Sequence, residues 1–157
     1  MKTRNIIALI ICISLPLLTG AVAGYVTSSN ISAWYVYLNK PQFNPPNWVF
    51  GPVWTALYIF MGVALYLIWK SPASRLRSKA LLIFIVQLIL NFAWSFLFFY
   101  FHQTGWALFE IEVLFVSIFL MSAIFFKISR PAAYLQIPYL CWVAFAAVLN
   151  ASLWYLN

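Results

Sequence analysis

The sequence predicts an all-α integral membrane protein that forms a bundle of five transmembrane helices. Hydrophobic residues make up 66% of the 157 residues and charged residues only 7%, whereas about a quarter of an average soluble domain is charged. A soluble domain of this length would leave much of its surface in water, so the composition excludes that class. Five apolar stretches, each near the ~20 residues that a helix needs to cross roughly 30 Å of hydrocarbon, give the number of helices.

The five predicted spans fill most of the chain and leave room for one domain over residues 1–157. They are residues 6–25, 48–69, 80–101, 106–126 and 132–155. None alternates apolar with polar residues, which argues against a transmembrane barrel. Aromatic residues mark the span ends, as is typical of the membrane interface: these are Trp48, Trp69, Tyr100, Trp106, Trp154 and Tyr155.

Basic residues are segregated to one side of the predicted membrane. Of the nine lysines and arginines, all but Lys40 precede the first span or lie in the loops after the second and fourth spans. The positive-inside rule makes that side cytoplasmic, so the N-terminus is expected inside and the long first loop outside. This bias suits a bacterial inner membrane. The net charge of +7 is therefore explained by topology rather than by nucleic-acid binding.

An alternative for the first span is a cleavable signal peptide. Lys2 and Arg4 precede an apolar run that ends near Ala21-Val22-Ala23, which is the general pattern of such peptides. The run is longer than the ~7–15 apolar residues of a signal core, so we favour a retained span. The other four spans keep their orientation under either interpretation.

The first loop, residues 26–47, is long for so small a protein. It holds four aromatic and three proline residues: Trp34, Tyr35, Tyr37, Phe43, Pro41, Pro45 and Pro46. Long loops in compact domains are usually functional or disordered, and prolines lower the entropy that ordering removes. We interpret the loop as a lid over the outer end of the bundle. The alternative is an interfacial loop whose aromatic residues lie among lipid headgroups.

A specific motif begins in the first loop and continues along most of the chain. It runs through Trp34-Tyr35, Asn39-Lys40-Pro41 and Pro45-Pro46-Asn47-Trp48-Val49-Phe50-Gly51-Pro52-Val53-Trp54-Thr55. It continues at Gln87, Asn91, Ala93-Trp94, Gly105-Trp106-Ala107-Leu108, Pro138-Tyr139-Leu140 and Trp142. These segments resemble the TspO/MBR family, which includes the tryptophan-rich sensory proteins and the translocator proteins, or peripheral benzodiazepine receptors. The resemblance covers nearly the whole chain and implies a five-helix bundle, in agreement with the span count.

Polar and aromatic residues converge on the predicted bundle interior. Gln87, Asn91 and Ser95 recur every four residues and share one helix face. They would either bond to neighbouring helices or supply a polar handle in an apolar ligand pocket. The second and fifth spans alternate rings with small residues, such as Trp54 with Gly51. For any single ring, core packing is the simpler explanation.

The resemblance implies a membrane receptor or sensor that binds tetrapyrroles, such as protoporphyrin IX or haem, and benzodiazepine-type drugs. The ligand is expected between the first loop and the first, second, third and fifth helices. The candidate ligand-binding residues are Trp34, Pro41, Gly51, Trp54, Tyr58, Asn91, Trp94, Trp106, Trp142 and Ala146. Of these, Trp54, Asn91, Trp94, Trp106, Trp142 and Ala146 match family positions that line the ligand cavity.

Two other functions remain open. Trp54 and Trp142 match tryptophans implicated in the porphyrin chemistry of the family, and would be catalytic if the protein broke down porphyrin with light and oxygen. Transport of porphyrin or sterol is the other alternative, although the chain shows no internal repeat of the kind common in secondary transporters. Sterol recognition is doubtful because no basic residue follows Tyr155 to complete the cholesterol motif of animal relatives.

The remaining expectations concern cofactors, partners and isolated residues. No His, Cys and acid cluster has metal-ligand spacing, and no cofactor is expected beyond porphyrin or haem as a ligand. Gly20 and Gly24 form a GxxxG pattern that indicates a close helix contact, within the bundle or in a homodimer, with the former favoured. Glu110 is expected near the outer end of the fourth helix, where the helix dipole favours a carboxylate. Glu112 has no role that the sequence explains.

Overall fold

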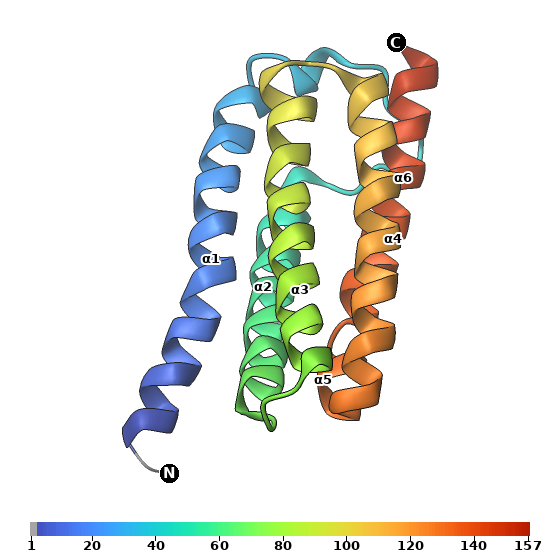
Figure 1. The fold of residues 1–157 in the computed structure, drawn as a ribbon. Helices are drawn as coiled ribbons and strands as arrows, with labels where there is room; N and C mark the ends of the chain where they lie inside the picture. Colours follow the sequence, from blue (N-terminus) through green and yellow to red (C-terminus); the bar gives the residue numbers. More distant parts are fainter. Residues whose placement is uncertain (1–2) are drawn as a thin grey trace.

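Helices account for the regular secondary structure of residues 3–157, which the computed structural model describes. They are α1 (Thr3–Ile31), the 3₁₀ turn η1 (Tyr35–Tyr37), α2 (Asn47–Lys70), α3 (Arg75–Ser95) with its π-helical extension η2 (Phe96–Tyr100), α4 (Thr104–Ile128), α5 (Arg130–Tyr134) and α6 (Ile137–Leu156). Figure 1 shows the long helices running side by side, with the first loop and the C-terminus at the same end. Five helical segments of this part of the chain are long and apolar enough to cross a membrane, which confirms the predicted fold class.

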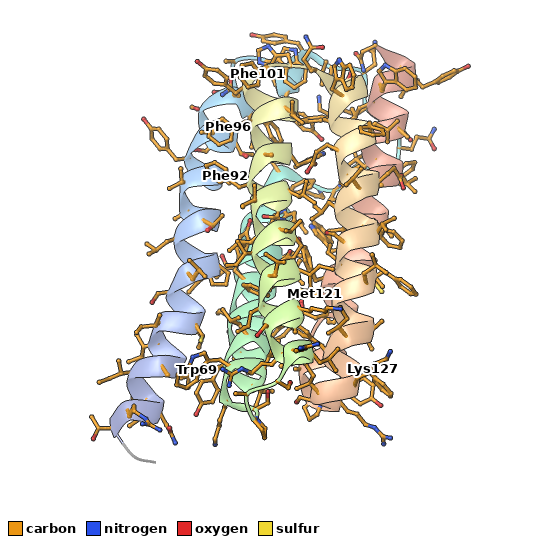
Figure 2. All side chains as sticks on the ribbon, viewed as in Figure 1. Trp69, Phe92, Phe96, Phe101, Met121 and Lys127 are labelled. Atoms are coloured by element: carbon orange, nitrogen blue, oxygen red, sulfur yellow. The ribbon has the colours of Figure 1, made fainter. Side chains whose placement is uncertain are left out.

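The outer faces of the rods are apolar. Ile10 and Leu18 on α1 and Val116 and Phe119 on α4 are all more than half exposed. Exposed apolar surface on this scale is unfavourable in water, by about 25 cal/mol for each Å², and favourable in lipid. Figure 2 shows that side chains project outward along the whole length of the bundle, with the labelled Lys127 near the end opposite the first loop. The lateral surface is therefore the lipid-facing surface.

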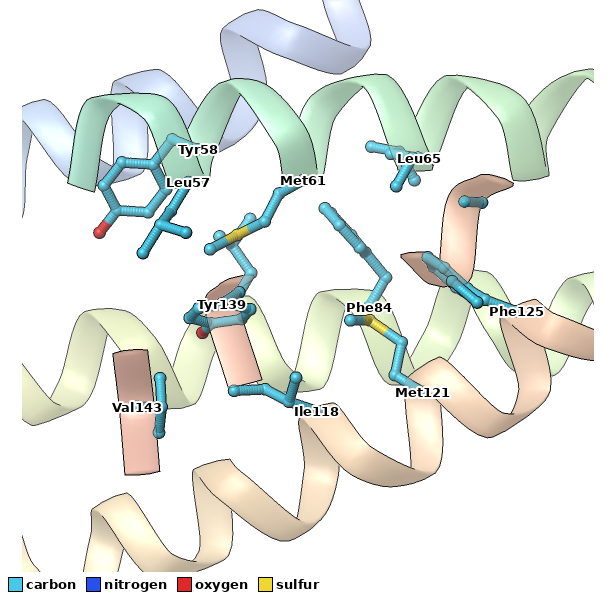
Figure 3. Close-up of a cluster of buried hydrophobic side chains, with 14 of the residues drawn as sticks. Leu57, Tyr58, Met61, Leu65, Phe84, Ile118, Met121, Phe125, Tyr139 and Val143 are labelled. Atoms are coloured by element: carbon cyan, nitrogen blue, oxygen red, sulfur yellow. The ribbon is translucent and has the colours of Figure 1, made fainter. Parts of the chain in front are cut away.

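Several of the largest fully buried side chains lie where α2, α3, α4 and α6 meet. Met61, Phe84, Ile118, Met121 and Tyr139 are fully buried there, and Figure 3 shows their side chains pointing toward one another from four helices. In contrast, α1 packs mainly against α2 and diverges from the bundle toward its N-terminal end (Figure 1). The bundle is therefore a packed four-helix unit with α1 along one side.

Glycines allow α1 to approach α2 closely. A Cβ atom at Gly62 would lie 2.5 Å from the Cα of Ile13, and one at Gly20 would overlap the ring of Tyr58. At Gly24 a Cβ would meet nothing within 4 Å. The GxxxG pattern thus makes an internal helix contact through its first glycine, while the second faces open space.

The first loop is shorter than expected because α1 continues to Ile31. The hydroxyls of Ser28 and Ser29 and the amide of Asn30 donate to backbone carbonyls three or four residues earlier, at 2.9–3.0 Å. These bonds satisfy the hydrogen-bond donors of the three side chains within the helix, so the polar residues do not end it. The expectation that residues 26–31 belong to the loop is therefore wrong, and the end of α1 becomes part of the outer half of the bundle.

Two of the predicted spans are not uniform α-helices. The fifth consists of α5 and α6, separated by a turn at Leu135 and Gln136. Pro138 lacks a backbone N–H and its ring would collide with the carbonyl four residues earlier, which explains the break. The third ends in η2, where the N–H of Phe101 donates to the carbonyl of Phe96 at 2.9 Å. Both features lie within segments that the apolar runs predicted as single helices.

Candidate ligand-binding cavity beneath the first loop

A cavity of about 520 Å³ lies in the half of the bundle nearest the first loop. Its walls come from α1, α2, α3 with η2, and α6, while Tyr35 of the first loop also lines it. Ligand pockets of small molecules typically measure about 300–1,000 Å³. The enclosing elements are the four helices and the loop that the sequence predicted for a ligand site.

The cavity is walled by flat rings on one side and by small residues on the other. Trp54 stacks on Tyr58 with ring centroids 5.5 Å apart, and Trp94 stacks on Phe98 at 5.2 Å. Phe50 meets the edge of Trp142 at 5.8 Å. The opposing face of α1 supplies small residues, namely Gly20, Ala21, Ala23, Gly24, Thr27 and Ser28. A flat, apolar molecule is the shape that such walls complement.

A buried hydrogen-bond chain fixes the ring of Tyr58 in the cavity wall. The hydroxyl of Tyr58 donates to Asn91 Oδ1 at 2.8 Å, and Asn91 Nδ2 donates to the hydroxyl of Tyr139 at 3.1 Å. The Tyr139 hydroxyl in turn donates to Gln87 Oε1 at 3.0 Å. Asn91 is not among the lining residues, whereas Tyr58 is, so Asn91 lies behind the wall and contacts the cavity lining through Tyr58.

Few polar atoms face the cavity. The indole N–H of Trp94 donates to Asn150 Oδ1 at 3.2 Å, and Asn150 Nδ2 donates to the carbonyl of Thr104 at 2.8 Å. The indole N–H of Trp142 is buried and has no hydrogen-bond partner among residues 3–157. A buried unpaired donor is unfavourable by about 1–3 kcal/mol. Trp142 lines the cavity with its ring, while its N–H points into packed protein.

The first loop closes the outer end of the cavity and is tied down at several points. The hydroxyl of Tyr35 donates to Asn44 Oδ1 at 2.7 Å, and burial raises the pKa of Tyr35 to about 12, opposed in part by this bond. Trp34 stacks on His102 with centroids 4.2 Å apart. The backbone N–H of Asn39 donates to Asn157 Oδ1 at 2.9 Å, and Asn157 Nδ2 donates to the carbonyl of Asn39 at 3.0 Å.

The structure brings together six of the ten candidate ligand-binding residues. Those that line the cavity are Gly51, Trp54, Tyr58, Trp94, Trp142 and Ala146. Trp34 and Pro41 belong to the loop above it, and Asn91 lies behind Tyr58, so these three are not lining residues. Ligand binding by any of the ten stays a prediction.

Trp106 was expected at the ligand cavity, and the structure places it outside that cavity. Its side chain is 67% exposed near the start of α4, in a shallow hollow that it shares with His102 and Trp154. Of the long helices, α4 is the one that contributes no lining residue to the main cavity. An aromatic ring at this end of a span suits the membrane interface, so Trp106 is an interfacial residue here.

The lining residues of α1 were not predicted from the sequence. Its wall consists of small side chains between Gly20 and Ser28 and of Leu17 and Ile31. The one available indication was the density of glycine, alanine and hydroxyl residues in an otherwise aliphatic helix.

Glu110 lies near the N-terminal end of α4, as expected from the sequence. It lies in the second turn of α4, is buried, and has no partner for either carboxyl oxygen within the described chain. The helix dipole acts chiefly on the first turn, so it does not explain this residue.

Comparisons with known proteins agree with this architecture. The model of the TspO/MBR family matches residues 12–156. The chain is 39% identical to a tryptophan-rich protein TspO from Chlorobaculum tepidum, over 98% of both sequences. It is 40% identical to the human translocator protein, over 77% of this chain and 73% of that one. It is 35% identical to a tryptophan-rich sensory protein from Cereibacter sphaeroides, over 79% and 77%. This chain is a multi-pass membrane protein that belongs to the TspO/MBR family.

Proposed function

We propose that this protein is a membrane receptor that binds a tetrapyrrole, such as protoporphyrin IX or haem, in the cavity beneath the first loop. Benzodiazepine-type drugs are expected to compete for the same space. The observation that supports the proposal best is a cavity of about 520 Å³ in which Trp54, Trp94 and Trp142 all present their rings. Membership of a family with sensory and translocator members adds to it.

The physical fit rests on shape and polarity. A macrocycle is flat and largely apolar, and offset stacking on an aromatic ring stabilises such a pair by about 0.5–1.5 kcal/mol beyond the area buried. The open space beside Gly24 and Gly51, where a Cβ atom would meet nothing within 4 Å, leaves room next to the rings.

Tryptophan fluorescence tests the proposal. Protoporphyrin IX should quench the fluorescence of the detergent-solubilised protein saturably. The double variant Trp54→Phe/Trp142→Phe should lose most of the binding, because both rings line the cavity. The matched control is Trp106→Phe/Trp154→Phe, which removes two exposed indoles outside the cavity and should preserve the affinity. Equal affinity in all three proteins would refute the site.

A second candidate function is the breakdown of bound porphyrin in light and oxygen. It is favoured by one feature, the placement of Trp54 and Trp142 on the same cavity, where indoles could react with oxygen species that an excited porphyrin generates. The reactive chemistry would belong to the porphyrin itself. A new absorbing product should form under illumination with the native protein and not with the Trp54→Phe/Trp142→Phe variant. Identical bleaching with both proteins would leave binding alone.

For the orientation, we favour a bacterial inner membrane with the N-terminus in the cytoplasm. Arg4, Lys70 and Lys127 lie toward one end of the bundle and the first loop lies at the other. The positive-inside rule then places the cavity and the first loop in the outer half of the membrane. In a background without the two native cysteines, a membrane-impermeant thiol reagent is applied to Tyr37→Cys in the first loop and to Ala73→Cys between α2 and α3. Only the first should be modified in intact cells.

A further inference from the structure

Glu112 lies on the outward face of α4, within the membrane. It is exposed, and its neighbours on the same face, Phe109 and Val116, are apolar and more than half exposed. It is eight residues beyond Thr104, the first residue of α4, and therefore about 12 Å from the start of the helix. With 25 residues, α4 is about 38 Å long, whereas the hydrocarbon is roughly 30 Å thick. Glu112 thus lies in the hydrocarbon region, on a surface that faces lipid.

The basic residues of the described chain lie away from Glu112. On α4 itself, Lys127 is fifteen residues further along, about 22 Å away. Lys40 belongs to the first loop, and His102 precedes α4 and stacks on Trp34. The other lysines and arginines among residues 3–157 lie toward the opposite end of the bundle. Ionisable side chains within membrane spans usually face the bundle interior or pair with another group, so an outward-facing carboxyl indicates that this surface is covered in the assembled protein.

The outward face of α4 also has a spacing that suits a second helix. Exposed residues recur on it at alternating intervals of three and four, at Phe109, Glu112, Val116, Phe119, Ala123 and Phe126. This is the spacing of the seam along which two helices pack side by side at a small crossing angle. We call these six residues the α4 stripe. A partner helix laid along the α4 stripe would cover Glu112, the one polar member, together with its apolar neighbours.

We propose that the α4 stripe is the contact between two copies of this chain, and that their Glu112 carboxyl groups hydrogen-bond to each other. A twofold axis along the membrane normal makes such a contact self-complementary and keeps both copies at the same depth, so that Glu112 meets its own counterpart. A carboxyl group that carries its proton both donates and accepts a hydrogen bond. Two such groups therefore satisfy each other without a third residue. Hydrogen bonds between polar side chains associate helices in lipid.

This inference goes beyond the proposed function and does not depend on the ligand of the cavity. A second copy is favoured as the occupant because it brings a matching group at the matching depth. The competing explanations are a lone glutamate accommodated by local distortion of the bilayer, a different membrane protein that carries a basic residue, and a dimer formed through another helix. Each of them makes a different prediction for the purified protein in lipid.

The experiment measures the association of the full-length protein in phosphatidylcholine vesicles. Donor and acceptor dyes are attached to Ala73→Cys, in the loop between α2 and α3, in a background without the two native cysteines. Energy transfer during dilution with lipid gives the dissociation constant of the dimer with Glu112, Glu112→Gln or Glu112→Leu. Thermal melts of the three proteins show whether the fold is preserved, which is expected because the side chain of Glu112 is exposed.

Cross-linking maps the contact independently. Single cysteines replace Val116 in the α4 stripe or Ile89 on α3, in the same background and without dyes. Both positions are more than half exposed, and both lie about 17 Å along their helices from the ends nearest the first loop. Ile89→Cys is therefore the matched control for Val116→Cys. Oxidation in the vesicles should link two copies through Val116→Cys and not through Ile89→Cys.

We expect Glu112→Leu to raise the dissociation constant of the dimer about tenfold, which is the loss of a strong pair of hydrogen bonds. Glu112→Gln should keep the wild-type value, because an amide also donates and accepts. A wild type that stays monomeric at every ratio of protein to lipid would overturn the inference and leave a lone glutamate or another protein as the explanation. Equal dissociation constants for wild type and Glu112→Leu, or cross-links through Ile89→Cys alone, would place the contact elsewhere and overturn it as well.

Discussion

At the scale of single residues, Ala146 sets the width of the cavity. It lines the cavity and lies one turn beyond Trp142 on α6, so the two share a helix face. Ala146→Thr adds two heavy atoms and a β-branch at this position. Overpacking a filled interior is unfavourable by about 1–3 kcal/mol, and only the ligand-bound state has this space filled. We predict about a tenfold loss of affinity, equivalent to about 1.4 kcal/mol, with the Tm of the ligand-free protein nearly unchanged.

A binding titration beside a thermal melt checks this prediction. Gly24→Ala is the matched control, because its new methyl group also enters open space on the opposite wall. It should reduce affinity less than the larger threonine does. Equal losses of affinity and of ligand-free stability in Ala146→Thr would instead identify Ala146 as an ordinary packing residue.

Asn91 acts on the ligand through another residue. Its amide bridges the hydroxyls of Tyr58 and Tyr139, and it does not line the cavity. Asn91→Leu keeps a similar volume and leaves the Tyr58 hydroxyl without its acceptor, which is unfavourable by about 1–3 kcal/mol. We predict a Tm lower by several degrees and a loss of affinity that is smaller than that of Trp54→Phe.

A double-mutant cycle with Tyr58→Phe tests this role, since that change removes the hydroxyl that Asn91 holds. The effect of Asn91→Leu on affinity should shrink when Tyr58 is already phenylalanine. A full, additive loss in the double variant would mean that Asn91 contacts the ligand directly, as the sequence-based hypothesis had it.

At the scale of the helices, Gly20 and Gly24 occupy adjacent turns of α1 and have opposite surroundings. A Cβ at Gly20 would overlap the Tyr58 ring, which a hydrogen bond and the Trp54 stack hold in place. We predict that Gly20→Ala lowers stability by about 1–3 kcal/mol, whereas Gly24→Ala raises it, by up to about 1 kcal/mol of helix propensity. Thermal melts of the two ligand-free variants check the signs. Equal shifts would show that α1 does not pack closely through this pattern.

The local sequence predicts the existence of each transmembrane helix better than it predicts where the helix begins and ends. Apolar run length predicts the spans because it reflects the thickness of hydrocarbon, which is a constraint on each helix alone. The extension of α1 to Ile31 depends on serine and asparagine side chains bonding back to carbonyls, and polar residues at a span end predict loop equally well. Pro138 was visible in the sequence, but a proline either kinks or ends a helix, and only packing decides which.

At the scale of the whole molecule, the site could be predicted as far as the resemblance identifies positions. It gave rings such as Trp54 and Trp142, which do line the cavity. The resemblance did not show which side chains reach the cavity surface. Asn91 lies behind the lining residues and Trp106 lies outside the cavity, because the rotation of each helix about its axis depends on contacts between helices. The first helix was expected at the cavity, but its lining residues were not identified, because small residues are recognised by the space beside them, which a sequence does not contain.

The reciprocal hydrogen bonds between Asn39 and Asn157 connect the first loop to the end of α6. Their consequence concerns rates. A ligand that enters or leaves past the first loop crosses the same barrier in both directions. The two Asn39–Asn157 hydrogen bonds lie outside the cavity, so breaking them changes the rates of association and dissociation and leaves the binding equilibrium unchanged. Asn157→Ala removes two bonds of about 0.5–1.5 kcal/mol each, so it should accelerate association and dissociation by a similar factor, between about fivefold and about a hundredfold, and leave Kd nearly constant. Stopped-flow quenching measures both rates. Faster dissociation with an unchanged association rate would mean that these hydrogen bonds stabilise the bound ligand itself. Equal rates in wild type and Asn157→Ala would mean that the ligand enters from the lipid-facing side of the bundle.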